Sequence, residues 1–284
     1  MNSESVSAHI VAWLKNSAEE AGVKTLIIGV SGGIDSAVTS TLACLTGLPV
    51  TVVNMPIHQN QDHVDRSDNH IEQLKNRFPN VTGYKVDLSK SFDALCADLP
   101  IPLDDDLANA NSRSRLRMTT LYAFANTQHG LVVGTGNKVE DYGVRFFTKF
   151  GDGGVDVSPI AELTKSQVFE LGRHLMVAEE ILVASPSDGL WNDGRTDEDQ
   201  IGASYDELEW AMSYYDSHSL RMGTDAESFP GSALIEADGL EERQVQVLRI
   251  FAERHEKNAH KMLPPPGCPI PQHFFAFVKH GEVA

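Results

Sequence analysis

A short apolar run that leads directly into a glycine-rich turn constrains the fold of this chain more than any other feature. Residues 25–30 (TLIIGV) are mostly apolar and rich in branched side chains, as expected of a strand buried on both faces of a parallel sheet. The turn at residues 31–36 (SGGIDS) follows at once, and a helical stretch runs from 36 to 45. This order of strand, turn and helix predicts the first unit of an α/β fold.

Further strands and helices alternate along the first half of the chain. Short apolar runs predict three more strands, at residues 50–55, 82–86 and 130–134. Helical patterns are expected at residues 6–21, 62–78 and 107–128. Because strands that alternate with helices form βαβ units, we predict an α/β fold with a doubly wound, Rossmann-like parallel sheet.

Beyond residue 150 the strand signals fade, and helical windows remain at residues 165–176, 205–215 and 241–261. We therefore predict a single domain over residues 1–284, with a nucleotide-binding α/β core at 1–160 and a mostly helical part at 161–284. A segment near residues 185–203 is rich in Gly, Asp and Pro. It is expected to be a loop, either a mobile loop beside a site or an ordinary surface loop.

Charge and composition argue against several classes of protein. The chain has 40 acidic and 23 basic residues and a net charge of -17, which would repel a phosphate backbone, so we expect no nucleic-acid partner. Cys44, Cys96 and Cys268 are widely spaced and suggest neither a disulfide framework nor a zinc site. No window approaches the roughly 18 apolar residues of a membrane span, and the N-terminus lacks a signal-peptide pattern. We expect no membrane association and a cytoplasmic location.

The turn at residues 31–36 has the properties of a phosphate-binding loop. Glycines let the backbone approach a ligand closely, and the N–H groups of the turn and the first helical residues point at an anion. The turn lacks the lysine and the glycine spacing of a Walker A loop. Asp35 lies at the start of the helix, where it is either a helix-terminal carboxylate or a magnesium ligand.

The six residues SGGIDS resemble the SGGxDS loop of the ATP pyrophosphatase superfamily. That resemblance implies that ATP is cleaved between its α- and β-phosphates and that the loop holds the departing pyrophosphate. It also makes Asp35 a magnesium ligand. The ATP-binding residues that it implies in this segment are Gly29, Val30, Ser31, Gly32, Gly33, Ile34, Asp35 and Ser36.

Later motifs resemble the NAD synthetase family over nearly the whole chain. They are NSRSRLRM at 111–118, GTGNKVE at 134–140, FFTKFGDGGVD at 146–156, LTK at 163–165 and GASY at 202–205. The resemblance implies an adenine nucleotide alpha hydrolase-like fold and an ammonia-dependent ligase that makes NAD, AMP and pyrophosphate from deamido-NAD, ATP and ammonia. It further implies a magnesium cofactor and a homodimer. No glutaminase domain is expected, because the chain begins almost directly at the synthetase domain.

The resemblance also implies roles for individual residues. The implied magnesium ligands are Asp35 and Glu140. The further ATP ligands are Thr135, Lys165 and Ser187. The deamido-NAD contacts are Arg115, Lys149, Asp156, His260 and Lys261. Taken without the motifs, Glu140 would be a solvated helix glutamate, Lys165 a surface lysine, and the arginines near residue 115 a charged helix stripe.

In the implied mechanism the nicotinate carboxylate attacks the α-phosphate, pyrophosphate leaves, and ammonia displaces AMP from the adenylate. Asp152 is our candidate catalytic residue, because a carboxylate beside the adenylate would collect ammonium and help to deprotonate it. Three features depart from the family pattern. Asn54 stands where several relatives have arginine, Ser187 where many have threonine, and the stretch at 139–147 is one residue longer than in some members.

Two alternatives compete with this interpretation. Another ATP pyrophosphatase, such as a tRNA thiolase or a GMP synthetase, would share the loop. A thiolase would need paired reactive cysteines and a basic RNA-binding surface, and the sequence suggests neither. The residues at 146–156 argue against a GMP synthetase. The second alternative is a non-catalytic nucleotide sensor, which would not need both Asp35 and Glu140 as metal ligands.

Overall fold

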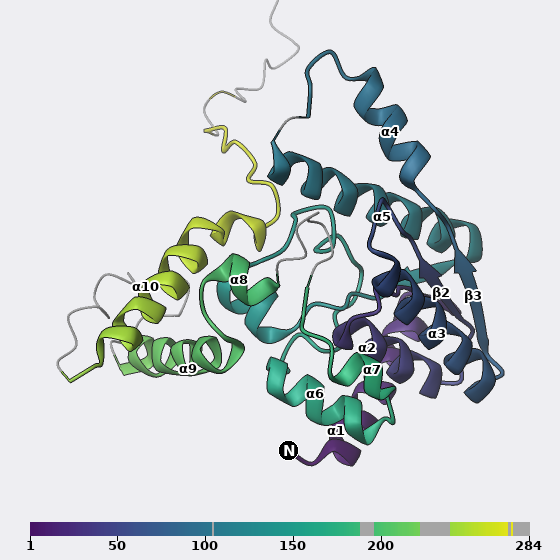
Figure 1. Cartoon of the computed structure of the whole chain (residues 1–284), viewed down its shortest axis with the longest axis horizontal. Coiled ribbons are helices and arrows are strands. Elements are labelled where there is room, and N and C mark those ends of the chain that lie inside the picture. Colours follow the sequence, from purple (N-terminus) through teal and green to yellow (C-terminus); the bar gives the residue numbers. More distant parts are fainter. Residues whose placement is uncertain (104, 188–195, 222–238, 272–273, 275–284) are drawn as a thin grey trace, which may run out of the picture.

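A four-stranded parallel sheet forms the centre of this computed structural model, which describes residues 1–103, 105–187, 196–221, 239–271 and 274 (Figure 1). Its strands are β1 (Thr25–Gly29), β2 (Val50–Asn54), β3 (Val81–Lys85) and β4 (Gly130–Val132). They lie in the order β3-β2-β1-β4, and Leu26 of β1 is in register with Val50 and Leu131. The predicted parallel sheet is confirmed.

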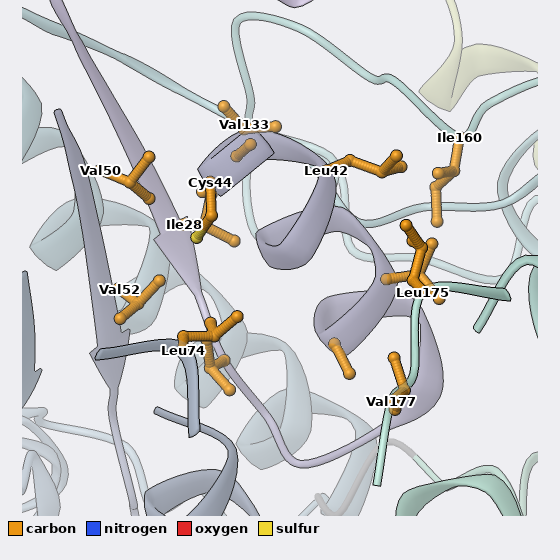
Figure 2. Close-up of a cluster of buried hydrophobic side chains, with 14 of the residues drawn as sticks. Ile28, Leu42, Cys44, Val50, Val52, Leu74, Val133, Ile160, Leu175 and Val177 are labelled. Carbon is orange, nitrogen blue, oxygen red and sulfur yellow. The ribbon is translucent and has the colours of Figure 1, made fainter. Parts of the chain in front are cut away.

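Helices cover both faces of the sheet, as a doubly wound fold requires. The core on one face contains residues of α1 (Ser3–Glu20), α2 (Ile34–Leu45), α3 (Gln61–Arg77), α6 (Lys165–His174) and α7 (Glu179–Leu182). The other face packs against α4 (Ser89–Asp98) and α5 (Asp106–Gln128). Ile28 of β1 points into the first core, where Figure 2 shows it with Val52 and Leu74, whereas Ile27 points into the second. Both faces are buried, which explains why the strand is apolar along its length.

The C-terminal half builds a further core of its own. It contains the π-helix η1 (Lys138–Val144), α8 (Asp197–Ile201), α9 (Tyr205–Arg221) and α10 (Glu242–Lys257), followed by the 3-10 helix η3 (Ala259–Lys261). Val139 and Val144 of η1 pack with Leu208 and Phe251 in this core. The chain therefore crosses between cores, because η1 joins the helical core whereas the later helix α6 packs on α1 and α2 in the core beside the sheet. The division at residue 160 stays a prediction.

Most predicted elements have counterparts within a few residues. The helix expected at 107–128 is α5 at Asp106–Gln128, whereas the one expected at 241–261 ends at Lys257 before η3. The expectation of a loop over 185–203 was wrong at α8, which begins where the Thr196 hydroxyl accepts a hydrogen bond from the Asp199 amide. The middle of that loop, residues 188–195, lies outside the described residues. Among the described helices, none is both long and apolar enough to cross a membrane.

Candidate active site

A cavity of about 820 Å³ opens at the carboxyl ends of β1, β2 and β4. Its walls come from the turn after β1, from α3 and α5, from the segment around η1 and from the end of α10. With one exception, every residue that the sequence assigned to ATP, magnesium, deamido-NAD or catalysis lines this cavity. The exception is Asp156. Residues up to 232 positions apart in sequence thus face one space, since Gly29 and Lys261 both line it.

The turn after β1 presents backbone donors at the N-terminus of α2. Gly32 has φ +82°, and a Cβ built on it would lie 2.8 Å from the carbonyl oxygen of His63. The Ser36 hydroxyl accepts a hydrogen bond from the Ser31 amide at 3.2 Å and donates one to the Gly33 carbonyl at 3.0 Å. The turn is therefore a braced concavity at a helix N-terminus, which suits the binding of a phosphate.

A buried lysine joins the two carboxylates that the sequence named as magnesium ligands. The Lys165 ammonium lies 2.6 Å from Asp35 Oδ2 and 2.8 Å from Glu140 Oε1, and the lysine side chain is only 2% exposed. Burial lowers the pKa of Lys165, but the two carboxylates outweigh it and hold the pKa above its usual value. Burial raises the pKa of Asp35 against the pull of Lys165, whereas Lys165 and its hydrogen bonds lower that of Glu140 against the effect of burial. The readings of Glu140 as a solvated glutamate and Lys165 as a surface lysine were wrong.

Tyr205 supports this centre from the helical half of the molecule. Its hydroxyl donates to Glu140 Oε1 at 2.5 Å and lies 3.3 Å from Asp197 Oδ2. The Lys165 ammonium sits over the Tyr205 ring, 4.8 Å from its centroid. Tyr205 therefore links the start of α9 to the centre on the sheet, and its motif at 202–205 was noted in the sequence without a role.

The donor set fits a magnesium ion that would be completed by substrate. In the described part of the chain no group of three or more His, Cys, Asp or Glu side chains could hold a metal by itself. Magnesium is usually bound by one or two carboxylates together with phosphate oxygens and waters. Asp35 and Glu140 supply two carboxylates beside the turn at 31–36, and in their present arrangement the Lys165 ammonium balances their charge.

Two further acidic side chains line the cavity near this centre. Asp152 Oδ1 accepts hydrogen bonds from the Ser114 hydroxyl at 2.7 Å and from the Thr148 amide at 3.0 Å. Burial raises the pKa of Asp152 despite these bonds. Asp141, which follows Glu140 on η1, also has a raised pKa, because it is buried and lies near Asp152. This part of the cavity is suited to a cation.

A basic cluster in the same cavity joins the C-terminal segment to the loop after η1. Lys149 Nζ donates to the carbonyls of His260 and Leu263 at 2.6 and 2.8 Å. Lys261 Nζ donates to the carbonyls of Arg145 and Phe147 at 3.0 and 2.7 Å. The Arg115 guanidinium lies 3.4 Å from the Lys149 carbonyl. The predicted deamido-NAD contacts Arg115, Lys149, His260 and Lys261 thus form one cluster.

Asp156 lies apart from that cluster. Its Oδ2 accepts a hydrogen bond from the Val132 amide at 2.8 Å, and its Oδ1 accepts one from the Tyr122 hydroxyl at 2.9 Å. These bonds tie the segment after the 151–154 turn to β4 and α5. A role for Asp156 in binding deamido-NAD stays a prediction.

The departures from the family pattern have local structural counterparts. Most of the longer stretch at 139–147 lies in η1, and a π-helix holds more residues per turn than an α-helix. Asn137 accepts hydrogen bonds from the Val139 and Glu140 amides at its start, and Arg145 ends it with φ +56°. Asn54 lines the cavity and donates to Asp68 Oδ1 at 2.7 Å.

Several cavity residues escaped the sequence reasoning. They include His63, Arg66, Asp141, Arg145 and Arg254. A polar helix such as α3 offers many charged side chains, and only the packing of α3 against the turn selects those that face the cavity. Arg145 and Arg254 come from the helical half, where Arg145 Nη1 donates to the carbonyl of His255 on α10.

Comparison with known proteins supports one family. The sequence model of the NAD synthase family matches residues 6–265. An NH(3)-dependent NAD(+) synthetase of Alkaliphilus metalliredigens is 40% identical over 215 residues, which are 70% of this chain and 82% of that protein. One from Methanosarcina acetivorans is 32% identical over 269 residues, covering 94% and 98%. The solved structure of an NMN synthetase from Francisella tularensis aligns with a TM-score of 0.77 at 31% identity, covering 95% of this chain and all of that one.

Proposed function

The chain belongs to the NAD synthase family, and from that premise we propose that it catalyses the final step of NAD biosynthesis, the ATP-dependent amidation of deamido-NAD with ammonia. It is a ligase of the AMP-forming kind, in agreement with the relatives named NH(3)-dependent NAD(+) synthetase. The observation that carries this proposal is the single cavity that joins the turn at 31–36, the Asp35–Lys165–Glu140 centre and the basic cluster near Lys261.

The first half-reaction joins two anions, and the protein supplies the means to bring them together. The nicotinate carboxylate oxygen attacks the α-phosphorus of ATP, and the bond from that phosphorus to the bridging oxygen breaks, which releases pyrophosphate. The amides of the 31–36 turn would hold the departing phosphates at the N-terminus of α2. Asp35 and Glu140 would hold magnesium, which when bound offsets the negative charge of the phosphates.

The second half-reaction needs neutral ammonia next to the adenylate. The ammonia nitrogen attacks the carbonyl carbon, the bond to the AMP oxygen breaks, and one proton must leave the nitrogen. Asp152 is our candidate to attract ammonium and accept a proton, because its carboxylate is held by Ser114 and Thr148 in the acidic part of the cavity. Its raised pKa favours proton acceptance.

The finer assignments are part of the same proposal. Arg115, Lys149, His260 and Lys261 contact deamido-NAD from the basic cluster, and Thr135, Lys165 and Ser187 contact ATP. The protein acts as a homodimer in the cytoplasm, an expectation that rests on the family resemblance and on the sequence. A contact between Asp156 and deamido-NAD is part of the same expectation, although Asp156 does not line the cavity.

A mononucleotide substrate is the second candidate. The Francisella tularensis structure that aligns over almost the whole chain is an NMN synthetase at 31% identity. Amidation of nicotinate mononucleotide would use the same carboxylate chemistry and differ only in the absence of the second nucleotide. The two candidates are separated by the substrate that gives the higher kcat/KM.

A coupled assay tests both candidates. Purified protein is incubated with ATP, magnesium and ammonium, and with either deamido-NAD or nicotinate mononucleotide, while amide product, AMP and pyrophosphate are measured. NAD formed one-for-one with AMP, and faster than NMN, supports the main proposal, and the reverse preference supports the second candidate. Glutamine in place of ammonium is expected to give no product. If ATP is cleaved with neither acceptor, the proposed function is wrong.

A further inference from the structure

The helix α3 packs directly on the turn at 31–36. A Cβ at Gly32 would lie 3.1 Å from the amide nitrogen of Ser67 and 3.2 Å from Cβ of Arg66. The Ser67 hydroxyl donates to the Val30 carbonyl at 2.7 Å, which anchors the helix to the base of the turn. The side chain of Arg66 therefore starts beside the glycine that shapes the turn, and it lines the cavity.

The Arg66 guanidinium has donors that no described residue satisfies. Its Nη2 donates to the His63 Nδ1 at 3.1 Å, which makes that ring nitrogen an acceptor. Its Nε is buried and has no hydrogen-bond partner among the described residues, and no described carboxylate forms an ion pair with it. A buried charged donor without a hydrogen-bond partner costs free energy, because it has lost its contacts with water. A bound ligand that accepts this hydrogen bond would explain such a group.

The charge around the turn favours an anionic ligand for this donor. Lys165, another cation near the turn, is already paired with Asp35 and Glu140. ATP brings several negative charges into a protein whose net charge is -17, so a cation that is not already neutralised is needed there. A guanidinium also matches two phosphate oxygens at once through its planar fork.

We propose that Arg66 is a phosphate ligand of the 31–36 turn that contacts the β- and γ-phosphates of ATP and retains them as pyrophosphate when they leave. His63 is a positioning residue that holds Nη2 and so orients the rest of the guanidinium toward the turn. This inference rests on the proposed function for the identity of the ligand, but the contact itself needs only a phosphate chain in the turn.

Isothermal titration with magnesium pyrophosphate, ATP and AMP tests the assignment. Arg66→Gln is expected to weaken the binding of pyrophosphate and of ATP about tenfold or more, which is the loss typical of a charge-assisted hydrogen bond. The same change is expected to weaken the binding of AMP by less than about twofold. Arg66→Lys keeps the positive charge but loses the planar fork. Its affinity for pyrophosphate and ATP is expected to lie between those of Arg66→Gln and the original protein. Lys75→Gln removes a charge from the exposed part of the same helix and is expected to change none of the three affinities.

The outcomes separate the inference from the proposed function. The inference is wrong if the affinity of Arg66→Gln for pyrophosphate is within about twofold of that of the original protein. It is also wrong if the affinity for AMP falls as much as the affinity for ATP. Both conclusions hold even where the original protein makes NAD. If the original protein makes no amide product but Arg66→Gln shows a selective loss of affinity for pyrophosphate, the contact is supported and the proposed function is wrong. Should Arg66→Gln melt at a much lower temperature, Arg66→Lys decides the question by the same comparison of ligands.

Discussion

At the scale of single residues, Lys165 has two functions that depend on each other. Its ammonium neutralises Asp35 and Glu140 while the three groups are buried together, and it faces the same cavity as the turn at 31–36. Removing one member of a buried ionic group leaves an uncompensated charge, which costs far more than a surface pair is worth. Asp35, Glu140 and Lys165 therefore stabilise one another only when all three are present. Phosphates or a divalent cation that bind there must compete with the ion pairs of Lys165 with Asp35 and Glu140.

Asp152 gives a prediction about ammonium. Asp152→Asn keeps the shape and an acceptor for the Ser114 hydroxyl but removes the negative charge that attracts ammonium and accepts its proton. We expect kcat/KM for ammonium to fall about a hundredfold, a typical general-base contribution, while the Michaelis constant for ATP changes by less than about threefold. Steady-state kinetics with each substrate varied in turn measures this. Equal changes for ammonium and ATP would exclude the assigned role.

His70 gives a prediction about the pH dependence of stability. It is 2% exposed and bonded to the Ser40 hydroxyl, and burial, helped by the charge of Arg77, lowers its pKa from 6.5 to about 4. Above pH 6.5 the ring is neutral in both the folded and the unfolded protein. As pH falls through this range the unfolded chain takes up the proton first, so stability is lost between pH 6.5 and pH 4, by about 3 kcal/mol in total.

The measurement is urea unfolding of the original protein and His70→Asn at pH 7 and at pH 4.5. Raised carboxylate pKa values elsewhere act in the opposite direction in both proteins, so the difference between the two pH dependences isolates His70. The loss of stability on acidification is expected to be smaller in the variant. Parallel curves for the two proteins would contradict the prediction.

At the scale of elements, the turn between β1 and α2 contains two glycines with different requirements. Gly32 has φ +82°, and its Cβ would meet the backbone oxygen of His63 at 2.8 Å. Gly33 has φ -93° and would place a Cβ 3.4 Å from the Ser31 hydroxyl, which is ordinary contact. The first position demands glycine because of both backbone strain and a clash with α3, and the second does not.

Alanine at each position tests this difference. Gly32→Ala is expected to lower the free energy of unfolding by about 2 kcal/mol or more, because the left-handed conformation alone costs about 1–2 kcal/mol. Gly33→Ala is expected to change it by less than about 1 kcal/mol, since its backbone is already extended. Chemical denaturation of both variants provides the comparison. Similar losses for the two would mean that the packing of α3 on the turn does not restrict Gly32.

At the scale of the whole molecule, the two cores meet at the site. Glu140 is on η1, which packs in the helical core, whereas Asp35 and Lys165 lie at the starts of α2 and α6, which share the core beside the sheet. The Tyr205 bond to Glu140 adds a second link from the helical half. Any shift of one half against the other would separate the carboxylates that the lysine joins, so the arrangement of the halves controls the geometry of the site.

The proposed homodimer is a prediction at the same scale. Sedimentation equilibrium is expected to give about twice the chain mass of 31.1 kDa at concentrations used in the assay. If binding of deamido-NAD depends on the partner subunit, specific activity should fall on dilution below the dissociation constant of the dimer. A monomer of 31.1 kDa that remains fully active would contradict this expectation.

The amino-acid sequence by itself determined the local parts of this protein. The apolar run at 25–30, the turn at 31–36 and the following helix were predictable because strand burial, glycine conformation and helix initiation depend on neighbours in the chain. Asp35, Glu140 and Lys165 could also be named, but only because whole motifs resembled those of a family. Residue spacing alone favoured a surface lysine and a solvated glutamate at two of these positions.

Only the tertiary structure decided which of these residues meet. Lys165 joins Asp35 across 130 positions of sequence, and Arg66 reaches the turn because α3 packs on Gly32. Asp156, named with the same motif as Asp152, bonds β4 and α5 instead of lining the cavity. Which residues meet depends on how the helices pack against the sheet and on which charged side chains are buried next to one another. Those are long-range packing and desolvation energies, and no local pattern of residues contains them.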